Sequence, residues 1–204
     1  MKTLLAVAAL TAAFSFRTDP VTSPAPKDAW IIDTAHSSVV FKVKHAGSSW
    51  FYGVFKTVTG TIALDAAAPD QSSFAVEIDA ASIDTRIADR DQHLRGPDFF
   101  DCKQFPTLSF TSSKVEKAGD DFTVAGTLSL HGIDKPLTVV VKPSGTGEMM
   151  GKKVAGFETT FVIKRSDFGI EYGLAQKALG DEVHLTIAVE ANPMEAKKEA
   201  GKSK

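Results

Sequence analysis

The chain has 204 residues with 23 basic and 25 acidic side chains, a formal net charge of −2, and a single cysteine. A mildly acidic balance argues against nucleic acid or an anionic membrane surface as a partner. One cysteine excludes an intramolecular disulfide, so the fold must be held by its core, and the chain is long enough to build one. We therefore expect one domain stabilised by its core, with no nucleic-acid partner.

The N-terminus predicts export. Met1-Lys2-Thr3 is a short basic start, residues 4–13 are apolar except Thr11, and Ala13-Phe14-Ser15 places small residues before a cut after Ser15. This order is typical of a secretory signal peptide, and the apolar run is too short to span a bilayer. We expect residues 1–15 to be removed, leaving a periplasmic or secreted protein without stable membrane insertion.

The rest of the chain divides simply. Residues 16–29 carry Pro20, Pro24 and Pro26, which predicts a flexible leader. Residues 194–204 predict a charged flexible tail, since four lysines and two glutamates gather there. No internal repeat or linker interrupts the remainder, so residues 30–193 are expected to form one domain.

Alternation of apolar and polar residues dominates that domain and predicts eight strands. Each has one apolar face, which favours an antiparallel sheet because parallel strands are buried on both faces. Eight such strands fit a closed barrel or a β-sandwich, and the strand count does not decide between them. The predicted strands cover residues 38–45, 57–64, 74–79, 107–111, 122–130, 137–141, 157–163 and 183–190.

Two irregularities interrupt the pattern. Phe55 is out of phase with Val58, which predicts a kink between Gly53 and Lys56. The long segment of about residues 84–106 has helical spacing at Ile87, Arg90, Asp91 and Leu94, and Pro97 is placed to open a second helical turn at 98–100. We expect this short helical segment to lie across one end of the sheet as a lid or plug.

The polar residues of this segment invite an enzymatic interpretation. Asp91 is placed to orient His93 as a general base. However, no nucleophile stands at a recognisable offset and no glycine motif for an oxyanion hole is present. We therefore expect Arg90 and Asp91 to pin the helix to the rim and expect no catalytic residues. The five histidines are scattered, with His131 in a turn, so neither a metal site nor a cofactor is expected.

The positions of the phenylalanines and glycines indicate how fully the interior of the sheet is packed. Of 14 phenylalanines only Phe14 lies in the predicted signal peptide, and many of the others fall on apolar strand faces. Gly60 and Gly126 occupy inward positions on strands that otherwise carry large residues. We expect the missing side chains to leave free volume inside the sheet.

A series of motifs in a fixed order resembles the YceI-like domain over about residues 30–191. The Ser82–Thr85, Arg90–Leu94 and Asp98–Asp101 stretches are the most specific. The other matching segments are Trp30–Asp33, His36-Ser37, Phe41–His45, Gly53–Phe55, Gly60–Ile62, Phe105–Phe110, Gly126–Gly132 and Arg165–Ile170.

This resemblance implies an all-β fold, an eight-stranded antiparallel lipocalin-like β-barrel, and so decides against the sandwich. It implies a polyisoprenoid chain enclosed in the barrel of a periplasmic or secreted protein. The turn at 46–52 departs from the family and brings aromatic bulk to the mouth of the barrel. The expected ligand-binding residues are Phe41, Val43, His45, Phe55, Ile62, Phe74, Val76, Phe110, Phe122, Leu128, Phe161 and Leu185. The expected residues of the entrance or lid are Trp50, Tyr52, Arg90, Asp91 and His93.

The sequence therefore favours binding, transport or storage of an isoprenoid or quinone-like lipid outside the cytoplasm. Two alternatives stay open: an enzyme that acts on a lipid headgroup through His93, His36 or His45, and an interaction module that holds no ligand. Whether the chain forms a homodimer also stays open.

Processing of the N-terminus is directly testable. We expect the mature protein to begin near Phe16, because the cut after Ser15 satisfies the small-residue rule. N-terminal sequencing of the native protein checks this, and recovery of Met1 would contradict it.

Overall fold

The computed structural model describes residues 29–194. The predicted signal peptide, nearly all of the leader and all of the tail except Met194 lie outside these residues. Among the helices of residues 29–194, none is long and apolar enough to cross a membrane.

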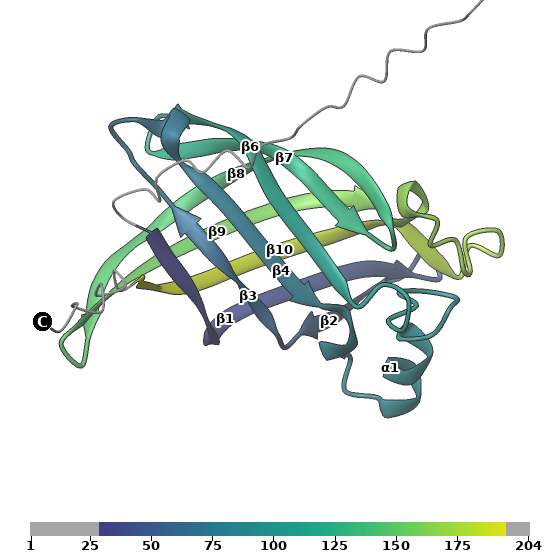
Figure 1. The fold of residues 1–204 in the computed structure, drawn as a ribbon. Helices are drawn as coiled ribbons and strands as arrows, with labels where there is room; N and C mark the ends of the chain where they lie inside the picture. Colours follow the sequence, from purple (N-terminus) through teal and green to yellow (C-terminus); the bar gives the residue numbers. More distant parts are fainter. Residues whose placement is uncertain (1–28, 195–204) are drawn as a thin grey trace, which may run out of the picture.

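Ten strands, one α-helix and three short 3-10 helices make up the described chain (Figure 1). The helices are η1 (Pro69–Gln71), η2 (Ala80–Ser82), α1 (Ala88–Leu94) and η3 (Arg165–Phe168). The strands are β1 (Ala29–His45), β2 (Ser49–Phe55), β3 (Val58–Ala63), β4 (Ser73–Asp79), β5 (Ile83–Asp84), β6 (Thr107–Ala118), β7 (Asp121–Leu130), β8 (Ile133–Met149), β9 (Lys152–Lys164) and β10 (Leu179–Pro193).

Eight of these strands close into an antiparallel barrel. The sheet runs β10-β9-β8-β7-β6-β4-β3-β1, and β10 also pairs with β1, so the first and last strands of the domain join. The remaining two strands, β2 and β5, extend the sheet along the far half of β1. The barrel predicted from the sequence is confirmed, while β2 and β5 were not among the eight predicted strands.

Alternation explains why the interior is apolar. In β7, Phe122, Val124, Leu128 and Leu130 are buried, whereas the intervening residues are partly or fully exposed. Because successive side chains of a strand point to opposite faces, one apolar residue in two is enough to fill the barrel. The same alternation on the other strands builds a single core.

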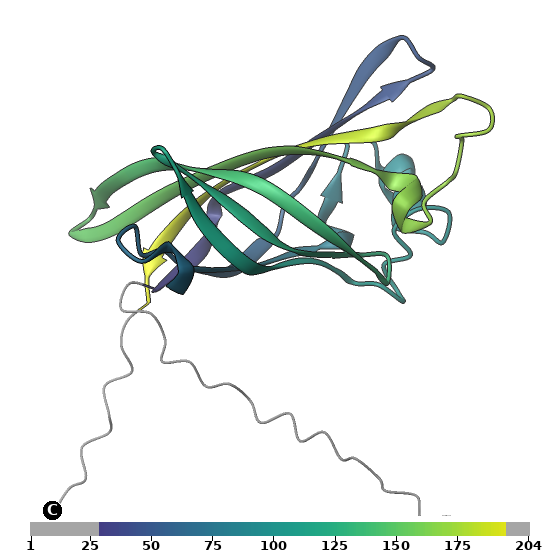
Figure 2. The same cartoon turned by 90° about the horizontal axis from the view of Figure 1, so that it is seen from above.

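The predicted kink lies between β2 and β3, at Lys56 and Thr57. The Lys56 N–H donates to the carbonyl of Ser82 over 3.2 Å, and the Thr57 N–H donates to the Ser82 hydroxyl over 3.1 Å. Ser82 thus accepts hydrogen bonds from two amides that do not pair with a neighbouring strand. The break allows β2 to follow the outer half of β1, and Figure 2 shows the resulting β1–β2 hairpin projecting beyond the barrel at the end that carries α1.

A second irregularity was not predicted. Opposite β10, the pairing of β1 jumps from Asp33↔Glu190 to Ser38↔Ala188, so β1 bulges over residues 34–37. The Ser37 hydroxyl donates to the Asp33 carbonyl over 2.6 Å and holds the bulge closed. Residues 34–37 are Thr, Ala, His and Ser, which are compatible with a regular strand, so no local pattern indicated the bulge.

The segment of about 84–106 is less helical than predicted. Only α1 forms, and residues 98–100 make a turn in which the Phe99 and Asp101 amides both donate to the carbonyl of Gly96. The expected second helical turn is therefore wrong, because the chain folds back on Gly96 after α1. The segment does lie at one end of the barrel, as Figure 1 shows.

The glycines do not leave free volume. A Cβ built on Gly126 would lie 2.3 Å from the Thr111 carbonyl oxygen and 2.6 Å from the Phe110 ring. At Gly60 it would lie 2.1 Å from the Ala75 carbonyl oxygen. The expectation drawn from these glycines is wrong, because a neighbouring ring or strand takes the place of the missing side chain.

This packing predicts a site-specific cost. Gly126→Ala should lower the free energy of unfolding by about 1–3 kcal/mol, because the methyl group must displace backbone as well as a ring. Gly147→Ala is the matched control, since its Cβ would meet only Val154 at 3.5 Å, and it should stay within about 0.5 kcal/mol of wild type. Urea unfolding checks both, and equal midpoints would contradict this packing.

Candidate ligand-binding site

Two chambers occupy the barrel interior. The larger, here the mouth chamber, has a volume of about 420 Å³ and lies beneath α1, next to the β1–β2 hairpin. The smaller, here the inner chamber, has a volume of about 90 Å³ and lies among β6 to β10 and the inner faces of β3 and β4. Both chambers are bordered by Leu108, Leu130, Ile163 and Leu185, so they adjoin inside one barrel.

Most of the predicted ligand-binding residues border one of these chambers. Phe122 does not; it is buried in the core. Phe41, Val43, His45 and Phe55 border the mouth chamber, Leu185 borders both, and Ile62, Phe74, Val76, Phe110, Leu128 and Phe161 border the inner chamber.

Aromatic rings form one wall of the mouth chamber. The ring of Phe41 lies 5.6 Å from that of Phe55, and Phe55 lies 5.4 Å from Phe100. Gly53 makes room for this arrangement, since a Cβ on it would come within 2.3 Å of the Phe41 ring. The local sequence of β2 therefore fixes where the aromatic wall stands.

Helix α1 is held over the mouth by a buried network around Thr85. Asp91, only 7% exposed, accepts the Thr85 amide over 2.8 Å and also the Thr85 hydroxyl. Arg90 donates from Nε to the same hydroxyl and from Nη2 to the Thr85 carbonyl. The guanidinium of Arg90 thereby stands 4.2 Å from the centre of the Phe51 ring, where it borders the chamber. Asp91 does not border the chamber but supports the residue that does.

Two of the three histidines proposed for an enzymatic reaction border the mouth chamber, and the third does not. His93 borders the mouth chamber and pairs with Asp98 over 2.9 Å, and His45 also borders the chamber. His36 lies elsewhere, on the outer surface. Among the described residues that border the mouth chamber, Ser49 alone carries a hydroxyl or thiol. This lining supplies little that could act as a nucleophile.

Arg165 borders the mouth chamber and was missed by the sequence analysis. It is 4% exposed and donates to the carbonyls of Gly180, Ile170 and Leu179 over 2.8, 2.9 and 3.1 Å. Burial lowers the pKa of its guanidinium, and the charge of Asp181 acts in the opposite direction. Its position in the Arg165–Ile170 motif was the one available signal.

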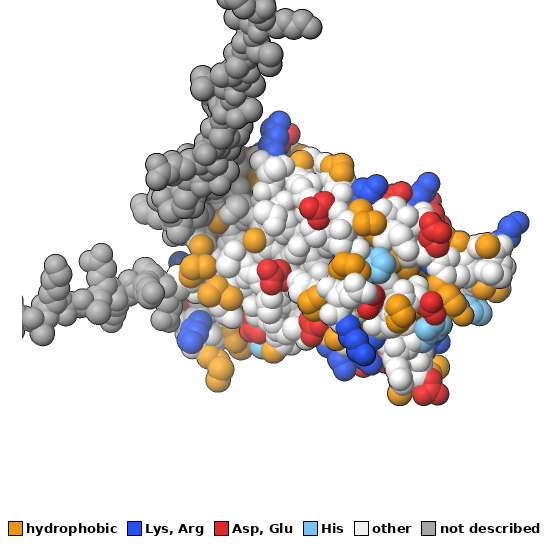
Figure 3. Space-filling view, turned by 45° about the vertical axis from the view of Figure 1, so that its right-hand side comes forward, with side chains coloured by type: hydrophobic (Ala, Val, Ile, Leu, Met, Phe, Trp, Pro, Cys, Tyr) orange, Lys and Arg blue, Asp and Glu red, His pale blue; other side chains and the backbone are white. Residues whose placement is uncertain are grey.

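The rim of the mouth carries cations around an exposed indole. The ammonium groups of Lys42 and Lys44 lie 4.6 and 4.7 Å from the centre of the Trp50 ring, and His184 meets its edge. Trp50 borders the chamber, whereas Tyr52 is 56% exposed and does not. Figure 3 shows histidine, hydrophobic and charged side chains gathered at this end of the molecule.

The wall between β8 and β9 is not fully closed. β8 pairs with β9 only from Val141 onward, so residues 133–140 of β8 face β9 without ladder hydrogen bonds. A surface pocket lies in this gap and shares Leu128, Leu137 and Ile163 with the inner chamber. These three side chains stand between the interior and the outer surface.

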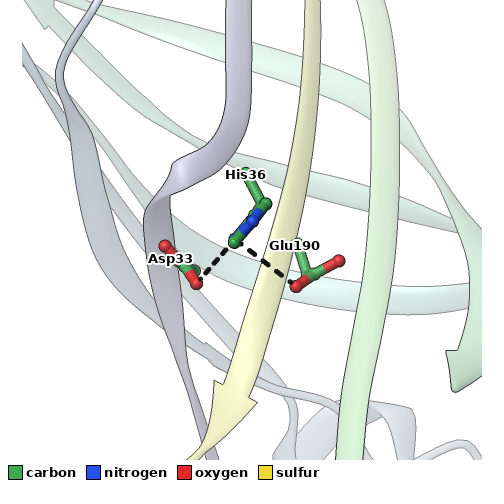
Figure 4. A group of neighbouring side chains, drawn as sticks. All are labelled: Asp33, His36 and Glu190. Carbon is green, nitrogen blue, oxygen red and sulfur yellow. Dashed lines mark hydrogen bonds and ion pairs between the residues drawn. The ribbon is translucent and has the colours of Figure 1, made fainter. Parts of the chain in front are cut away.

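A separate group of charged side chains lies on the outer surface at the bulge of β1 (Figure 4). His36 stands between Asp33 and Glu190, at 3.0 and 3.8 Å, and the ligand atoms of all three lie within 4.8 Å of one another. The hydrogen bond to Asp33 raises the pKa of His36 and lowers the pKa of Asp33. This spacing suits a divalent cation as well as an ion pair. No local pattern indicated this group, because β10 supplies the third residue from the far end of the chain.

A closed antiparallel barrel with an apolar interior defines the class of the protein, a lipocalin-like barrel. Its sequence then gives the family: residues 30–191 match the YceI-like domain, and the chain belongs to that family.

Curated relatives and solved structures agree with this assignment. Protein YceI of Escherichia coli is 42% identical over 156 residues, which cover 76% of this chain and 81% of that protein. BcnA of Burkholderia cenocepacia has a TM-score of 0.71 at 28% identity, covering 78% of this chain and 98% of that one. The YceI protein of Campylobacter jejuni has a TM-score of 0.66 at 34% identity, covering 74% and 90%. A domain from Saccharophagus degradans, described as polyisoprenoid-binding, shares the fold at 18% identity with a TM-score of 0.62 over 81% and 98%.

The network around Thr85 predicts different consequences for two residues of α1. Asp91→Ala should cost about 1–3 kcal/mol of stability, because it leaves the buried Thr85 amide without an acceptor. His93→Ala should change stability little, since His93 is exposed and its partner is exposed Asp98. Thermal unfolding of the two variants separates them, and equal losses would contradict the role given to Asp91.

Proposed function

We propose that this protein binds a long isoprenoid-type lipid in the two chambers and carries or stores it outside the cytoplasm. The observation that supports this most is the pair of adjoining chambers inside a closed barrel, with the inner one surrounded mainly by aliphatic and aromatic side chains. Transport and storage both require such a site, because the chain must be kept out of water.

The energetics of burial favour such a ligand. Each buried methylene contributes about 0.8 kcal/mol, so a five-carbon isoprene unit contributes up to about 3–4 kcal/mol before the costs of ordering. A few units therefore give tight binding without many polar contacts. The inner chamber, whose lining is largely Phe, Leu, Ile and Val, matches this requirement.

The comparisons support the same class of ligand. The Saccharophagus degradans domain is described as binding a polyisoprenoid, and its barrel resembles this one. A quinone-like lipid also carries an isoprenoid chain, so it belongs to the proposed class. The proposed location outside the cytoplasm follows from the signal peptide predicted in residues 1–15.

A binding role is favoured over an enzymatic one by the lining of the mouth chamber. His93 is paired with Asp98, His36 lies on the outer surface, and Ser49 is the sole hydroxyl or thiol of the described lining. Covalent catalysis needs a nucleophile within hydrogen-bond reach of its base. The structure records no such pair beside this chamber.

Replacing a chamber wall residue tests the proposal. Val43→Trp should reduce binding of geranylgeraniol strongly while leaving the empty protein folded, because the indole would enter space that the lipid fills. In a solid core the same overpacking would cost about 1–3 kcal/mol or more. Val40→Trp is the matched control, since Val40 lies on the opposite face of the same strand.

Fluorescence titration with geranylgeraniol and thermal unfolding measure the two effects. Reduced binding by Val43→Trp alone, with near-native melting, supports the proposal. Unfolding of Val43→Trp together with no binding by wild type would indicate a solid core and an interaction module. Unchanged binding would show that Val43 does not border the lipid site.

A further inference from the structure

The mouth chamber has an uneven charge. Its lining includes two arginines, Arg90 and Arg165, and two histidines, His45 and His93. No Asp or Glu is among the lining residues in the part of the chain that the structure describes. Both guanidinium groups are hydrogen-bonded to neutral groups of the protein, but no carboxylate of the chamber lining neutralises their charge, and burying a charge that is not neutralised is costly.

Arg165 is the more telling of the two arginines. It is 4% exposed, and the three groups that accept its hydrogen bonds are neutral carbonyls. The nearby carboxylate of Asp181 instead accepts the amide and hydroxyl of Ser166, over 2.9 and 2.8 Å. The charge of Asp181 still acts on Arg165 from a distance, but none of the ion pairs within 4.0 Å among the described residues includes this buried cation.

Arg90 is also available to a ligand. Its Nε and Nη2 are bound to Thr85, and Nη1 has no hydrogen-bond partner among residues 29–194. The guanidinium is held in place over the Phe51 ring at 4.2 Å. A fixed guanidinium loses little conformational entropy when it binds an anion, and it offers the geometry that a phosphate or carboxylate prefers.

The acidic groups near the chamber are engaged elsewhere. Asp91 accepts the amide and hydroxyl of Thr85, and Asp98 pairs with His93. Neither borders the chamber. The rim adds cations, since Lys42 and Lys44 both stand over the ring of Trp50. Cations at a rim raise the local concentration of an anionic ligand.

We propose that the lipid carried by this protein bears an anionic headgroup, a phosphate or a carboxylate, which Arg90 and Arg165 bind in the mouth chamber while the chain extends toward the inner chamber. The proposal rests on the lipid-binding function proposed above and specifies the chemistry of the headgroup. An anionic headgroup would supply the negative charge that the described lining of the mouth chamber lacks. Hydrogen bonds to ionised groups are also about twice as strong as those between neutral groups.

Two ligands with the same chain test this directly. Full-length protein is titrated with geranylgeraniol and with geranylgeranyl monophosphate, below the concentrations at which either forms micelles. Wild type is expected to bind the monophosphate at least about tenfold more tightly, which corresponds to about 1.4 kcal/mol. Equal affinity, or tighter binding of the alcohol, overturns the proposal and favours a neutral headgroup such as a quinone.

Two arginine variants locate the effect. Arg90→Gln should bring the ratio of the two affinities toward one. Arg95→Gln is the matched control and should leave the ratio at its wild-type value. Arg95 lies just beyond α1 and donates to the backbone carbonyls of Ala81 and Ile83 over 2.8 Å, but does not border the chamber. A ratio that falls equally in both variants overturns the assignment to Arg90, as does a ratio that falls in neither.

The test separates this proposal from the one on which it rests. If wild type binds neither ligand, the lipid-binding function itself fails. If wild type binds both equally, lipid binding stands and the anionic headgroup fails. The comparison within wild type needs no variant, so it decides the question even if Arg90→Gln does not fold.

Discussion

Pairing between β1 and β10 is the constraint on which the rest of the structure depends, because it joins the first and last strands of the domain and turns a sheet into a barrel. A closed sheet has no exposed edges along this seam, and its inner face is shielded from water. The seam is not uniform. At the bulge of β1 the ladder is interrupted, and the Ser37 hydroxyl connects the strands instead, since it donates to the Asp33 carbonyl and accepts from the Glu190 amide. His36 adds a contact of 3.8 Å to the Glu190 carboxylate. A cavity that excludes water exists only because this seam holds.

Within the closed barrel, the space left for a ligand depends on how closely neighbouring strands approach one another. Gly126 and Gly53 allow the rings of Phe110 and Phe41 to lie against a neighbouring strand, which moves aromatic bulk to the chamber walls. By contrast, residues 133–140 of β8 do not pair with β9. There only the side chains of Leu128, Leu137 and Ile163 separate the inner chamber from a surface pocket. The polar groups gather at one end, under α1. A chain bound here would have its polar end near the arginines and its apolar end among aliphatic residues.

Much of this arrangement could be predicted from the sequence, for a clear physical reason. Side-chain direction alternates along a strand, so the phase of Phe41 and Val43 toward the interior could be inferred from the pattern of residues alone. The inward position of Phe55, which is out of phase with Val58, was implied by the resemblance to the YceI-like domain. The resemblance to the YceI-like domain then decided between barrel and sandwich. The kink before Val58 was also predictable, since Phe55 and Val58 are both buried although they are three residues apart.

Other features depend on contacts that no local pattern reveals. Phe122 has the same phase as Leu128, yet only Leu128 borders a chamber, since Phe122 is packed within the core. Arg165 receives its partners from residues 170–180, and His36 meets Glu190 across the seam. Tyr52 was expected at the mouth with Trp50 but is 56% exposed and does not border the mouth chamber, since the buried face of β2 is formed by Gly53 and Phe55. These relations arise only when the sheet closes.

We propose that the two chambers hold a lipid with an isoprenoid chain. Native mass spectrometry of the protein, released gently and without detergent from the organism that makes it, tests this most directly. We expect a mass above that of the polypeptide, with fragmentation that releases an isoprenoid chain. A bound lipid without isoprene units would contradict the account, and so would an empty protein that also fails to bind added geranylgeraniol.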